Sequence, residues 1–471
     1  MARQQIGLVG LDVMGQNLVL NMESRGYAVA GYNRTTEKMT RFIAARCQGK
    51  NVAGYAKIED FCAALVRPRK VVLMVKAGAP VDAVIEQLRP HLGPGDLLID
   101  AGNSHFADTE RRLAALQKDG LLYIGTGVSG GEEGALKGPS IMPGGSEAAY
   151  ALVKDIFEKI AAQVDGPCCT YIGPRGAGHY VKMVHNGIEY GIMECISEVY
   201  DLLKTVLGLK APALAKIFAA WTAAELGGYL MDITADILTR KDADTKKPLV
   251  DVILDKAGQK GTGKWTSQNA LDLGVAVPTI DMAVEGRILS AFKEERVAAA
   301  KVLKGPRPRA GIAWARLVKA LRDGLYVSVI ACYAQGFALL REASREYQYD
   351  LKLPEVARIW KGGCIIRSKL LDPITEAYRA RPDLANLLVA PFFAKIVKAK
   401  AHGLRLAVTA AVKAGVPVLG LGSALSYIDA YRRPRMPADL TQAQRDYFGA
   451  HTYERLDKPG TFHTEWIERP C

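Results

Sequence analysis

The chain has 471 residues, of which 49% are hydrophobic, so it can bury large cores and is not a disordered protein. At about 100–200 residues per domain, we expect two or three domains. The formal net charge is +13, but the basic residues are spread along the chain without a tract typical of nucleic-acid binding, so we expect anionic small molecules as partners and no nucleic acid.

The cysteines and the N-terminus further restrict the class of protein that we expect. None of the eight cysteines forms a Cys-x-x-Cys pair, so the sequence predicts neither a metal site nor a disulfide framework, and the thiols are expected to be reduced. Residues 1–5 lead directly into an apolar strand, without the apolar region of a signal peptide. No segment reaches the roughly 18 uninterrupted apolar residues of a membrane helix. We therefore expect a cytoplasmic protein that does not enter a membrane.

A glycine-containing turn follows the first predicted strand, residues 5–10. Gly10 and Gly15 occupy the first and third positions of the G-x-G-x-x-G pattern, which presents the N–H groups of a helix N-terminus to a pyrophosphate. The middle position is Asp12, whose carboxylate must turn away from the phosphates or weaken their binding. The pattern is weak alone. Its candidate cofactor contacts are Gly10, Leu11, Asp12, Val13, Met14 and Gly15.

The end of the second predicted strand, residues 27–32, strengthens this interpretation. Asn33, Arg34 and Thr35 follow it, where an NAD enzyme carries the acid that binds the ribose. The acid is missing and a guanidinium is present, which favours NADP because arginine binds a 2′-phosphate that a carboxylate would repel. The alternative is an ordinary turn after a strand.

Further strands are predicted at residues 71–75, 97–100 and 122–125, with helical patterns between them. Strands that alternate with helices predict an α/β doubly wound Rossmann sheet, which binds ligands at the carboxyl ends of its strands. The loop predicted after the last strand, residues 126–131, contains Ser129, Gly130 and Gly131, a hydroxyl and successive N–H groups that suit an anion. A flexible loop without a ligand is the alternative.

From residue 178 onward the pattern is that of long helices, one reaching about residue 206 and another covering residues 314–345. In the first, Lys182, His185, Asn186 and Glu189 share one face at i, i+3, i+4 and i+7. The other faces are apolar, so this helix should be buried, and its polar face should line a cavity. These residues form either a catalytic set or a satisfied polar network in the core.

The two long helices share a spacing pattern. Residues 182–187 and 319–324 both follow Lys-x-x-x-Asn/Asp-Gly, which suggests a degenerate internal duplication. Arg322 and Tyr326 replace the histidine and the glutamate in the second copy, so we expect it to have kept a structural role only. Coincidence between two apolar helices is the alternative.

Three further features remain. The Gly-rich loop at 257–265 lacks the spacing of a nucleotide-hydrolysing loop, but Lys260 could bind a substrate phosphate. Arg287, in an apolar helix, is a candidate for a buried arginine. After residue 432 we expect an irregular, aromatic tail that is too short for its own core and packs on a partner subunit.

Taken together, the motifs closely resemble those of the decarboxylating 6-phosphogluconate dehydrogenases of the pentose phosphate pathway. The resemblance runs almost from end to end. Its motifs are GLDVMGQN (10–17), NRT (33–35), VKAG (75–78), GVSGGE (127–132), KMVHNGIEY (182–190), GTGKW (261–265), GGCIIR (362–367) and QRDYFGAH (444–451).

The resemblance implies a homodimer whose chains have three parts: an NADP-binding Rossmann domain (1–177), a large all-helical domain (178–434) and a C-terminal tail (435–471) that reaches the partner subunit. It also implies an NADP-dependent oxidoreductase of gluconate utilisation that converts 6-phosphogluconate to ribulose 5-phosphate and CO2. Asp12 is a departure, because the family usually has a small residue there.

Site residues follow from the same resemblance. Lys182 would be the general base and acid, and Glu189 the second acid. The cofactor contacts would be those of residues 10–15 and 33–35 together with Val75, Lys76, Ala77 and Asn103. The substrate contacts would be Asn103, Ser129, Gly130, Gly131, His185, Asn186, Tyr190, Lys260 and Arg287, with Arg445 and His451 donated by the other subunit.

The expected chemistry uses no metal. Hydride would leave C3 for NADP while neutral Lys182 takes the C3 hydroxyl proton, so the cavity must lower the lysine pKa from about 10.4. Protonated Lys182 would then assist loss of CO2, and Glu189 would protonate C1 of the enediol. One alternative is a β-hydroxyacid dehydrogenase that does not decarboxylate; another, a nucleic-acid-binding protein, rests on the charge alone.

Overall fold

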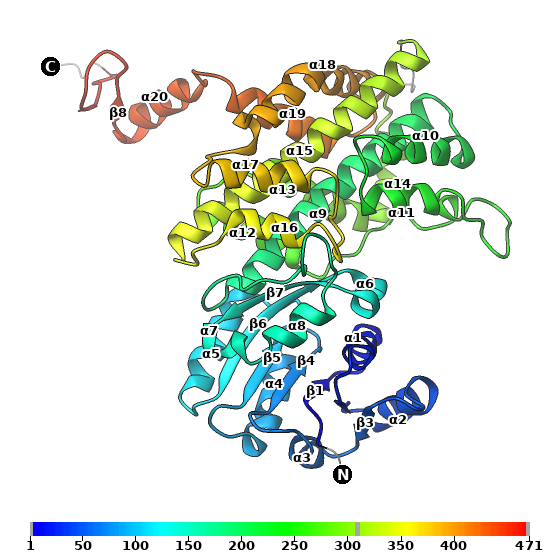
Figure 1. Cartoon of the computed structure of the whole chain (residues 1–471). Coiled ribbons are helices and arrows are strands. Elements are labelled where there is room, and N and C mark those ends of the chain that lie inside the picture. Colours follow the sequence, from blue (N-terminus) through cyan, green and yellow to red (C-terminus); the bar gives the residue numbers. More distant parts are fainter. Residues whose placement is uncertain (1–2, 307–310, 468–471) are drawn as a thin grey trace. The chain divides into compact units, whose positions relative to one another are not determined.

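The computed structural model describes residues 3–306 and 311–467. The chain divides into two compact units, Met1–Ala424 and Leu425–Cys471. The first unit contains a strand-and-helix part, drawn in blue to cyan in Figure 1, and a helical part, drawn mainly in green to yellow.

The strand-and-helix part is built on one sheet of seven strands in the order β3-β2-β1-β4-β5-β6-β7. The first six strands of this order run parallel, and β7 pairs with β6 in the antiparallel sense. The chain order reverses between β1 and β4, so this sheet has the switch point at which Rossmann folds bind dinucleotides. The strands are β1 (Ile6–Val9), β2 (Val29–Tyr32), β3 (Val52–Tyr55), β4 (Lys70–Leu73), β5 (Leu97–Asp100), β6 (Leu122–Ser129) and β7 (Ser140–Gly145).

Hydrophobic cores cover both faces of this sheet. Because strand side chains alternate between faces, Leu8 and Val72 belong to one core, while Val9 and Leu73 belong to the other. This double burial explains the continuous apolar runs of the central strands. The helices of this part are α1 (Val13–Ser24), α2 (Thr36–Arg46), α3 (Ile58–Ala63), α4 (Ala79–Leu88), η1 (Arg89–His91), α5 (Phe106–Gln117), α6 (Gly131–Lys137), α7 (Glu147–Ala151) and α8 (Lys154–Ile160).

The doubly wound sheet is confirmed, but two strands were not predicted and one prediction is wrong. Strand β3 is a half-buried edge strand with the same four residues, VAGY, as β2, and β7, with the sequence SIMPGG, carries proline and glycine. Residues 126–129, predicted as a loop, are the second half of β6 and pair with β7. The small residues that suggested a loop are instead required because other backbone lies against this strand.

The helical part is organised around two long buried helices, α9 (Ala177–Asp201) and α15 (Trp314–Glu346). Both were predicted, and α9 continues as a short π-helix, η2, over Leu202–Val206. Helix α9 packs on β6 and β7 at one side and on α12, α13 and α15 at the other. The other helices are α10 (Ala211–Ala223), α11 (Tyr229–Ile237), η3 (Leu249–Asp251), α12 (Thr262–Asp272), α13 (Pro278–Ala291), α14 (Lys293–Val302), α16 (Leu353–Ile359), α17 (Leu371–Ala380), η4 (Leu387–Val389), α18 (Pro391–Ala414) and α19 (Leu419–Tyr431).

Helix α15 is long and apolar enough to cross a membrane by length and composition alone. However, 94% of its most apolar stretch is buried inside the structure, where it packs on α9 and α18. It is therefore a core helix, as its length and apolar composition also allow.

The second copy of the Lys-x-x-x-Asn/Asp-Gly pattern lies on α15 and forms an ion-pair network. Asp323, whose side chain is 7% exposed, pairs with Lys319 at 2.5 Å and with Lys400 of α18. Lys400 also lies 3.4 Å from Glu225, which pairs with Arg322. The network joins α15 to α18 and to the segment after α10, which is the structural role expected for this copy.

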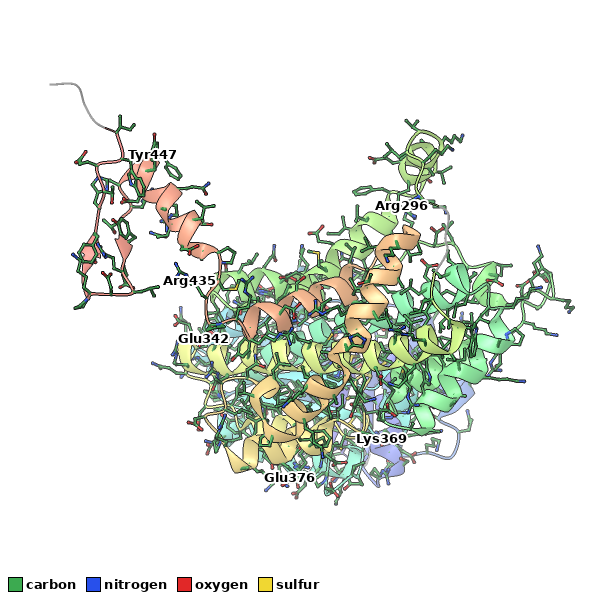
Figure 2. The ribbon with its side chains drawn as sticks, turned by 90° about the horizontal axis from the view of Figure 1, so that it is seen from above. Arg296, Glu342, Lys369, Glu376, Arg435 and Tyr447 are labelled. Atoms are coloured by element: carbon green, nitrogen blue, oxygen red, sulfur yellow. The ribbon has the colours of Figure 1, made fainter. Side chains whose placement is uncertain are left out.

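The second unit contains helix α20 (Ala438–Gly449) and a small hairpin of β8 (Tyr453–Glu454) and β9 (Thr461–Phe462). In Figure 2, Arg435 lies just before α20 and Tyr447 lies in its last turn. The prediction of an irregular tail is therefore wrong. The signal that was missed is a run of good helix formers without glycine or proline between residues 438 and 448.

The unit is held together by one buried carboxylate, Asp446, rather than by an apolar core. Asp446 accepts hydrogen bonds from the backbone N–H groups of Thr452 and Thr464 and from the side chains of His463 and Trp466. Burial acts to raise the pKa of Asp446, but these donors outweigh it and lower the pKa to about 2. Its charge therefore fastens the hairpin to α20.

We predict that Asp323→Asn lowers the free energy of unfolding by about 1–3 kcal/mol, because it leaves two lysines beside a neutral amide. Burial acts to raise the pKa of Asp323, but Lys319 and Lys400 outweigh it and lower the pKa. The contribution should thus be full above the ordinary carboxyl pKa of about 4 and disappear as the pH falls through the lower, folded-state value.

Chemical denaturation at neutral pH checks this prediction. Asp236→Asn is the matched control, because Asp236 forms an exposed ion pair with Arg240 on α11's C-terminal side. The two variants should differ clearly, and equal stability would contradict a structural role for the network.

Candidate active site

Helix α9 presents the predicted polar face inside the protein. Lys182 and His185 are 5% and 0% exposed, while Asn186 and Glu189 are half-buried. The helix approaches the sheet closely because glycines face it: a Cβ at Gly127 of β6 would overlap the Lys182 side chain. The periodicity predicted the shared polar face, whereas the contact of Lys182 with β6 is created by the fold.

One set of hydrogen bonds links the end of β6 through α9 to α12. The Ser129 Oγ lies 3.2 Å from His185 Nε2, and His185 Nδ1 lies 3.1 Å from Asn186 Oδ1 and 3.4 Å from Lys182 Nζ. Asn186 Nδ2 donates to Thr262 Oγ1 at 3.0 Å. His185 and Asn186 are thus fixed by neighbours on two other elements.

Glu189 stands apart from this set. The imidazole of His185 lies 4.0 Å from it, and it makes no hydrogen bond with the residues that the structure describes. Within the same described residues, the hydrogen-bond contact of Lys182 is its long one with His185. The alternative of a satisfied network in the core requires both groups to be paired, so the geometry favours a face that lines a binding cavity.

Burial sets the protonation of these groups. It lowers the pKa of Lys182, although the nearby Glu189 and Cys364 act in the opposite direction. It raises the pKa of Glu189, opposed by Lys182 and Arg287. Burial and the charge of Lys182 together hold the pKa of His185 well below its usual range. The face therefore favours a neutral amine, a protonated carboxyl and a neutral imidazole.

Arg287 lies at the far end of the same face. Its guanidinium carbon is 3.3 Å from the centroid of the Tyr190 ring, and Nη1 donates to the carbonyl of Gly258 at 3.4 Å. Arg287 is half-buried, so the prediction of a buried arginine is wrong: its guanidinium stacks on Tyr190 at a partly exposed position. Lys260 is exposed in the loop whose Gly258 carbonyl accepts from Arg287.

The glycine turn after β1 has the form needed to hold a pyrophosphate. Gly10 has φ +102°, and a Cβ there would overlap the carbonyl oxygen of Met74; a Cβ at Gly15 would overlap that of Gly10. Helix α1 begins at Val13 without a side-chain cap, so its first N–H groups are free for an anion. The residues present therefore fit a dinucleotide, with Leu11, Val13 and Met14 supplying the turn between the glycines.

Asn33 connects this turn to the end of β2. Its Oδ1 accepts from the Leu11 N–H at 2.9 Å, and its Nδ2 donates to the Thr35 carbonyl at 3.0 Å. Arg34 and Thr35 are exposed beside it. Arg34 therefore directly follows the residue that joins β2 to the glycine turn, and it makes no ion pair with any described residue.

Asp12 behaves as its position in the turn requires. Its carboxylate is 81% exposed and pairs with Lys38 of α2 instead of capping α1. The carboxylate is thus directed to solvent and α2, and its effect on pyrophosphate binding stays a prediction. Lys38 was not among the predicted residues, because only the fold brings it to the glycine turn.

The other predicted contacts lie at the carboxyl ends of β4, β5 and β6. Val75 and Ala77 are half-buried and Lys76 is exposed after β4, and Asn103 is exposed after β5. Ser129 ends β6, and Gly130 and Gly131 begin α6. Parallel strands bring these loops to one edge of the sheet, close to Lys182 of α9.

Two predicted substrate residues belong to the second unit. Arg445 is exposed on α20, where its Nη1 donates to Gln442 Oε1 at 3.0 Å. His451 is exposed in the turn after α20, between Ala450 and Thr452, which both have positive φ.

Several residues of the site were not predicted as functional. Thr262 holds Asn186, the Trp360 ring lies edge-on to His185 at 5.4 Å, and the Cys364 thiol lies near Lys182. Thr262 and Cys364 stand inside motifs of the resemblance, which was the available signal. Trp360 lay outside every motif.

Comparisons with known proteins agree with this geometry. Residues 5–173 match the family model described as the NAD binding domain of 6-phosphogluconate dehydrogenase, and residues 178–466 match the model of its C-terminal domain. The chain belongs to the 6-phosphogluconate dehydrogenase family. The two models together cover nearly all of the first unit and most of the second.

Individual members of the family are similar over their full length. The chain is 57% identical to the NADP(+)-dependent, decarboxylating 6-phosphogluconate dehydrogenase of Bacillus subtilis, covering 99% of this chain and 100% of that protein. The decarboxylating enzyme of Escherichia coli is 54% identical with the same coverage. The 6-phosphogluconate dehydrogenase of Plasmodium falciparum, whose structure was solved with NADP+ and with 6-phosphogluconate, matches with a TM-score of 0.93 at 43% identity over 98% of this chain and 100% of that chain.

We predict that Asp12→Ala leaves kcat nearly unchanged and lowers the Kd for NADP, because it removes an anion beside the phosphate turn and releases Lys38. The effect should be about two- to fivefold and should shrink at high salt, since the pair is exposed. Titration of protein fluorescence with NADP measures it. Weaker binding by the variant would show that the carboxylate assists the cofactor.

Proposed function

We propose that this protein catalyses the oxidative decarboxylation of 6-phospho-D-gluconate to D-ribulose 5-phosphate and CO2, with reduction of NADP to NADPH. The observation that carries this proposal is the buried face of α9. There Lys182, whose pKa burial lowers, and Glu189, whose pKa burial raises, lie on one helix face beside a Rossmann sheet. Relatives that cover the whole chain bear the name of this activity.

Lys182 would serve first as a base and then as an acid. As a neutral amine it accepts the proton of the C3 hydroxyl while NADP, when bound, accepts the hydride from C3. The resulting ammonium can then donate a proton to the C3 ketone oxygen while the neighbouring carboxylate leaves as CO2. Burial supports both roles, because a lysine with a lowered pKa gives and takes a proton at little cost near neutral pH.

Glu189 would protonate C1 of the enediol that remains after CO2 has left. Its raised pKa and its lack of a hydrogen-bond partner among the described residues leave the carboxyl proton available. Because Glu189 lies two turns along α9 from Lys182, the two groups reach different atoms of one bound sugar acid. His185 and Asn186 would hold the substrate oxygens that lie between Lys182 and Glu189.

The substrate is proposed to lie between the loops after β5 and β6 and the cations at the opening of the site. Arg287 and Lys260 suit the 6-phosphate, since an arginine binds phosphate through two N–H groups. Tyr190 supports this by stacking under Arg287. The proposed substrate contacts are Asn103, Ser129, Gly130, Gly131, His185, Asn186, Tyr190, Lys260 and Arg287, together with Arg445 and His451 of a partner subunit in a homodimer.

We also propose that the chain has three parts, 1–177, 178–434 and 435–471, and that the protein is located in the cytoplasm. The start of α9 at Ala177 supports the first boundary. The cysteines that the structure describes are all free thiols, which suits a reducing compartment. NADP would be held by residues 10–15 and 33–35, by Val75, Lys76 and Ala77 and by Asn103.

Incubation of purified protein with 6-phosphogluconate and NADP tests the activity. CO2 and NADPH should form in equal amounts, and the sugar product should be ribulose 5-phosphate. NADPH without CO2 would instead identify a β-hydroxyacid dehydrogenase that does not decarboxylate.

We predict that Lys182→Met lowers kcat by about 10³-fold or more, because no other amine lies on the face. Lys319→Met is the matched control, since Lys319 occupies the equivalent position of the second pattern but its side chain is 76% exposed. In the wild type, kcat/KM should fall as the pH drops through the pKa of Lys182, which lies below the ordinary 10.4. Turnover by Lys182→Met would contradict the assignment of the base.

We also predict a strong preference for NADP over NAD, because Arg34 is exposed beside the glycine turn and no carboxylate stands at the end of β2. Arg34→Ala should lower kcat/KM for NADP by about 10–100-fold and change the value for NAD little. Steady-state kinetics with both cofactors measure this. Similar kcat/KM values for the two cofactors in the wild type would refute the preference.

A further inference from the structure

Arg112 of α5 is a buried cation that the proposed mechanism does not use. Its side chain is 2% exposed, and it lies behind the carboxyl ends of β4 and β5 rather than in the cavity beside α9. All three guanidinium nitrogens take part in hydrogen bonds. Such a group is costly to bury, so its partners indicate what it holds.

On one side Arg112 holds the loop after β4. Nη2 donates to the carbonyl of Gly78 at 3.0 Å, and Nε and Nη2 donate to the two carboxylate oxygens of Asp82 at 2.8 and 3.1 Å. Gly78 ends the loop that carries Lys76 and Ala77, and α4 begins directly after it. The guanidinium therefore fixes both the end of this loop and the helix that follows.

On the other side the same guanidinium reaches the loop after β5. Nη1 lies 3.4 Å from Asp100 Oδ2 and 3.4 Å from Ser104 Oγ. Ser104 Oγ donates to Asp100 at 2.6 Å, and the Gly102 N–H donates to the other carboxylate oxygen at 3.1 Å. The exposed Asn103 lies between Gly102 and Ser104, so both of its neighbours are tied to one carboxylate.

We propose that Arg112 is a positioning residue for the cofactor: by bridging Gly78 and Asp100 it holds the loops after β4 and β5 at a fixed separation, so that both bind one NADP molecule. The inference rests on the proposed function, because it needs NADP at this edge of the sheet. The planar guanidinium of arginine can donate hydrogen bonds in three directions at once, and the single ammonium group of a lysine does not reproduce this arrangement.

The neighbouring Arg111 contacts the same carboxylate as Arg112 and represents a role that is electrostatic only. Its Nη2 also contacts both oxygens of Asp82, at 3.0 Å each, but its side chain is 56% exposed. Its other partner is Asp108 of its own helix, and neither loop is among its contacts in the described structure. The two arginines therefore share a carboxylate and differ in the bridge between the loops.

This comparison defines the experiment, in which Arg112→Lys is compared with Arg111→Lys in the full-length protein. The Kd for NADP and the Kd for 6-phosphogluconate are measured separately by calorimetry, and thermal unfolding is recorded for each variant. Arg112→Lys keeps the charge beside Asp82 and Asp100 but loses the bridge. We expect its Kd for NADP to rise roughly 10-fold while the Kd for 6-phosphogluconate stays within about twofold. Arg111→Lys should change neither.

Ser104→Ala provides a second and milder variant. It removes the hydroxyl between Asp100 and Arg112 without touching the ion pair, so a smaller loss of NADP affinity in the same direction is expected. It keeps the proposal testable if Arg112→Lys does not fold.

The outcomes separate the inference from the proposed function. If Arg112→Lys and Ser104→Ala both lower the unfolding temperature but leave the Kd for NADP unchanged, Arg112 is a stabilising residue only and the inference is overturned. Equal weakening of NADP and 6-phosphogluconate would overturn it too, because the loss would not be local to the loops. Failure of the wild type to bind NADP would instead contradict the proposed function.

Discussion

The site depends on the contact between α9 and the last two strands of the sheet, where main chain lies against main chain. Cβ atoms at Gly178 of α9 and at Gly144 of β7 would each overlap backbone of the other element. A Cβ at Gly127 of β6 would overlap Lys182 itself. Because no side chain separates helix from sheet, the position of the lysine is fixed by backbone geometry and not by its own flexible chain.

The same contact determines the charges of the site. A helix pressed against a sheet excludes water, and this desolvation is the largest influence on the pKa values of Lys182, His185 and Glu189. Lys182 and Glu189 each favour the charged form of the other, but burial outweighs that attraction. Burial therefore shifts Lys182 towards the neutral amine and Glu189 towards the carboxylic acid, which is the direction needed to start with a base and finish with an acid.

Sequence reasoning could predict the parts of the site that depend on local pattern. The shared face of Lys182 and Glu189 follows from helical spacing, and the glycine turn with Arg34 follows from a short motif after a strand. It could not predict contacts that only the fold creates. Lys38 reaches Asp12 from another helix, Thr262 reaches Asn186 across 76 positions, and Arg112 joins two loops without any sequence signal.

The predictions that failed were made from local composition, whereas tertiary packing determines the structure of these segments. The small and polar residues at 126–131 suggested a flexible loop, yet residues 126–129 belong to a buried strand that must accept α9 and β7 at close range. The tail was predicted to be too short for its own core, and it does not depend on an apolar core. One buried carboxylate with four hydrogen-bond donors organises it instead. Polar satisfaction can replace hydrophobic burial in so small a unit.

The two copies of the Lys-x-x-x-Asn/Asp-Gly pattern show why spacing alone does not identify a catalytic lysine. In the first copy the lysine is buried and contacts His185, and an amide, Asn186, stands four positions after it; burial lowers the pKa of this lysine. In the second copy the side chain of Lys319 is 76% exposed and the buried partner, Asp323, is a carboxylate shared with Lys400. The carboxylate pairs with both lysines and thereby turns the pattern into a structural link. The change from amide to carboxylate, together with burial of the acid instead of the base, is sufficient to separate a catalytic face from a stabilising one.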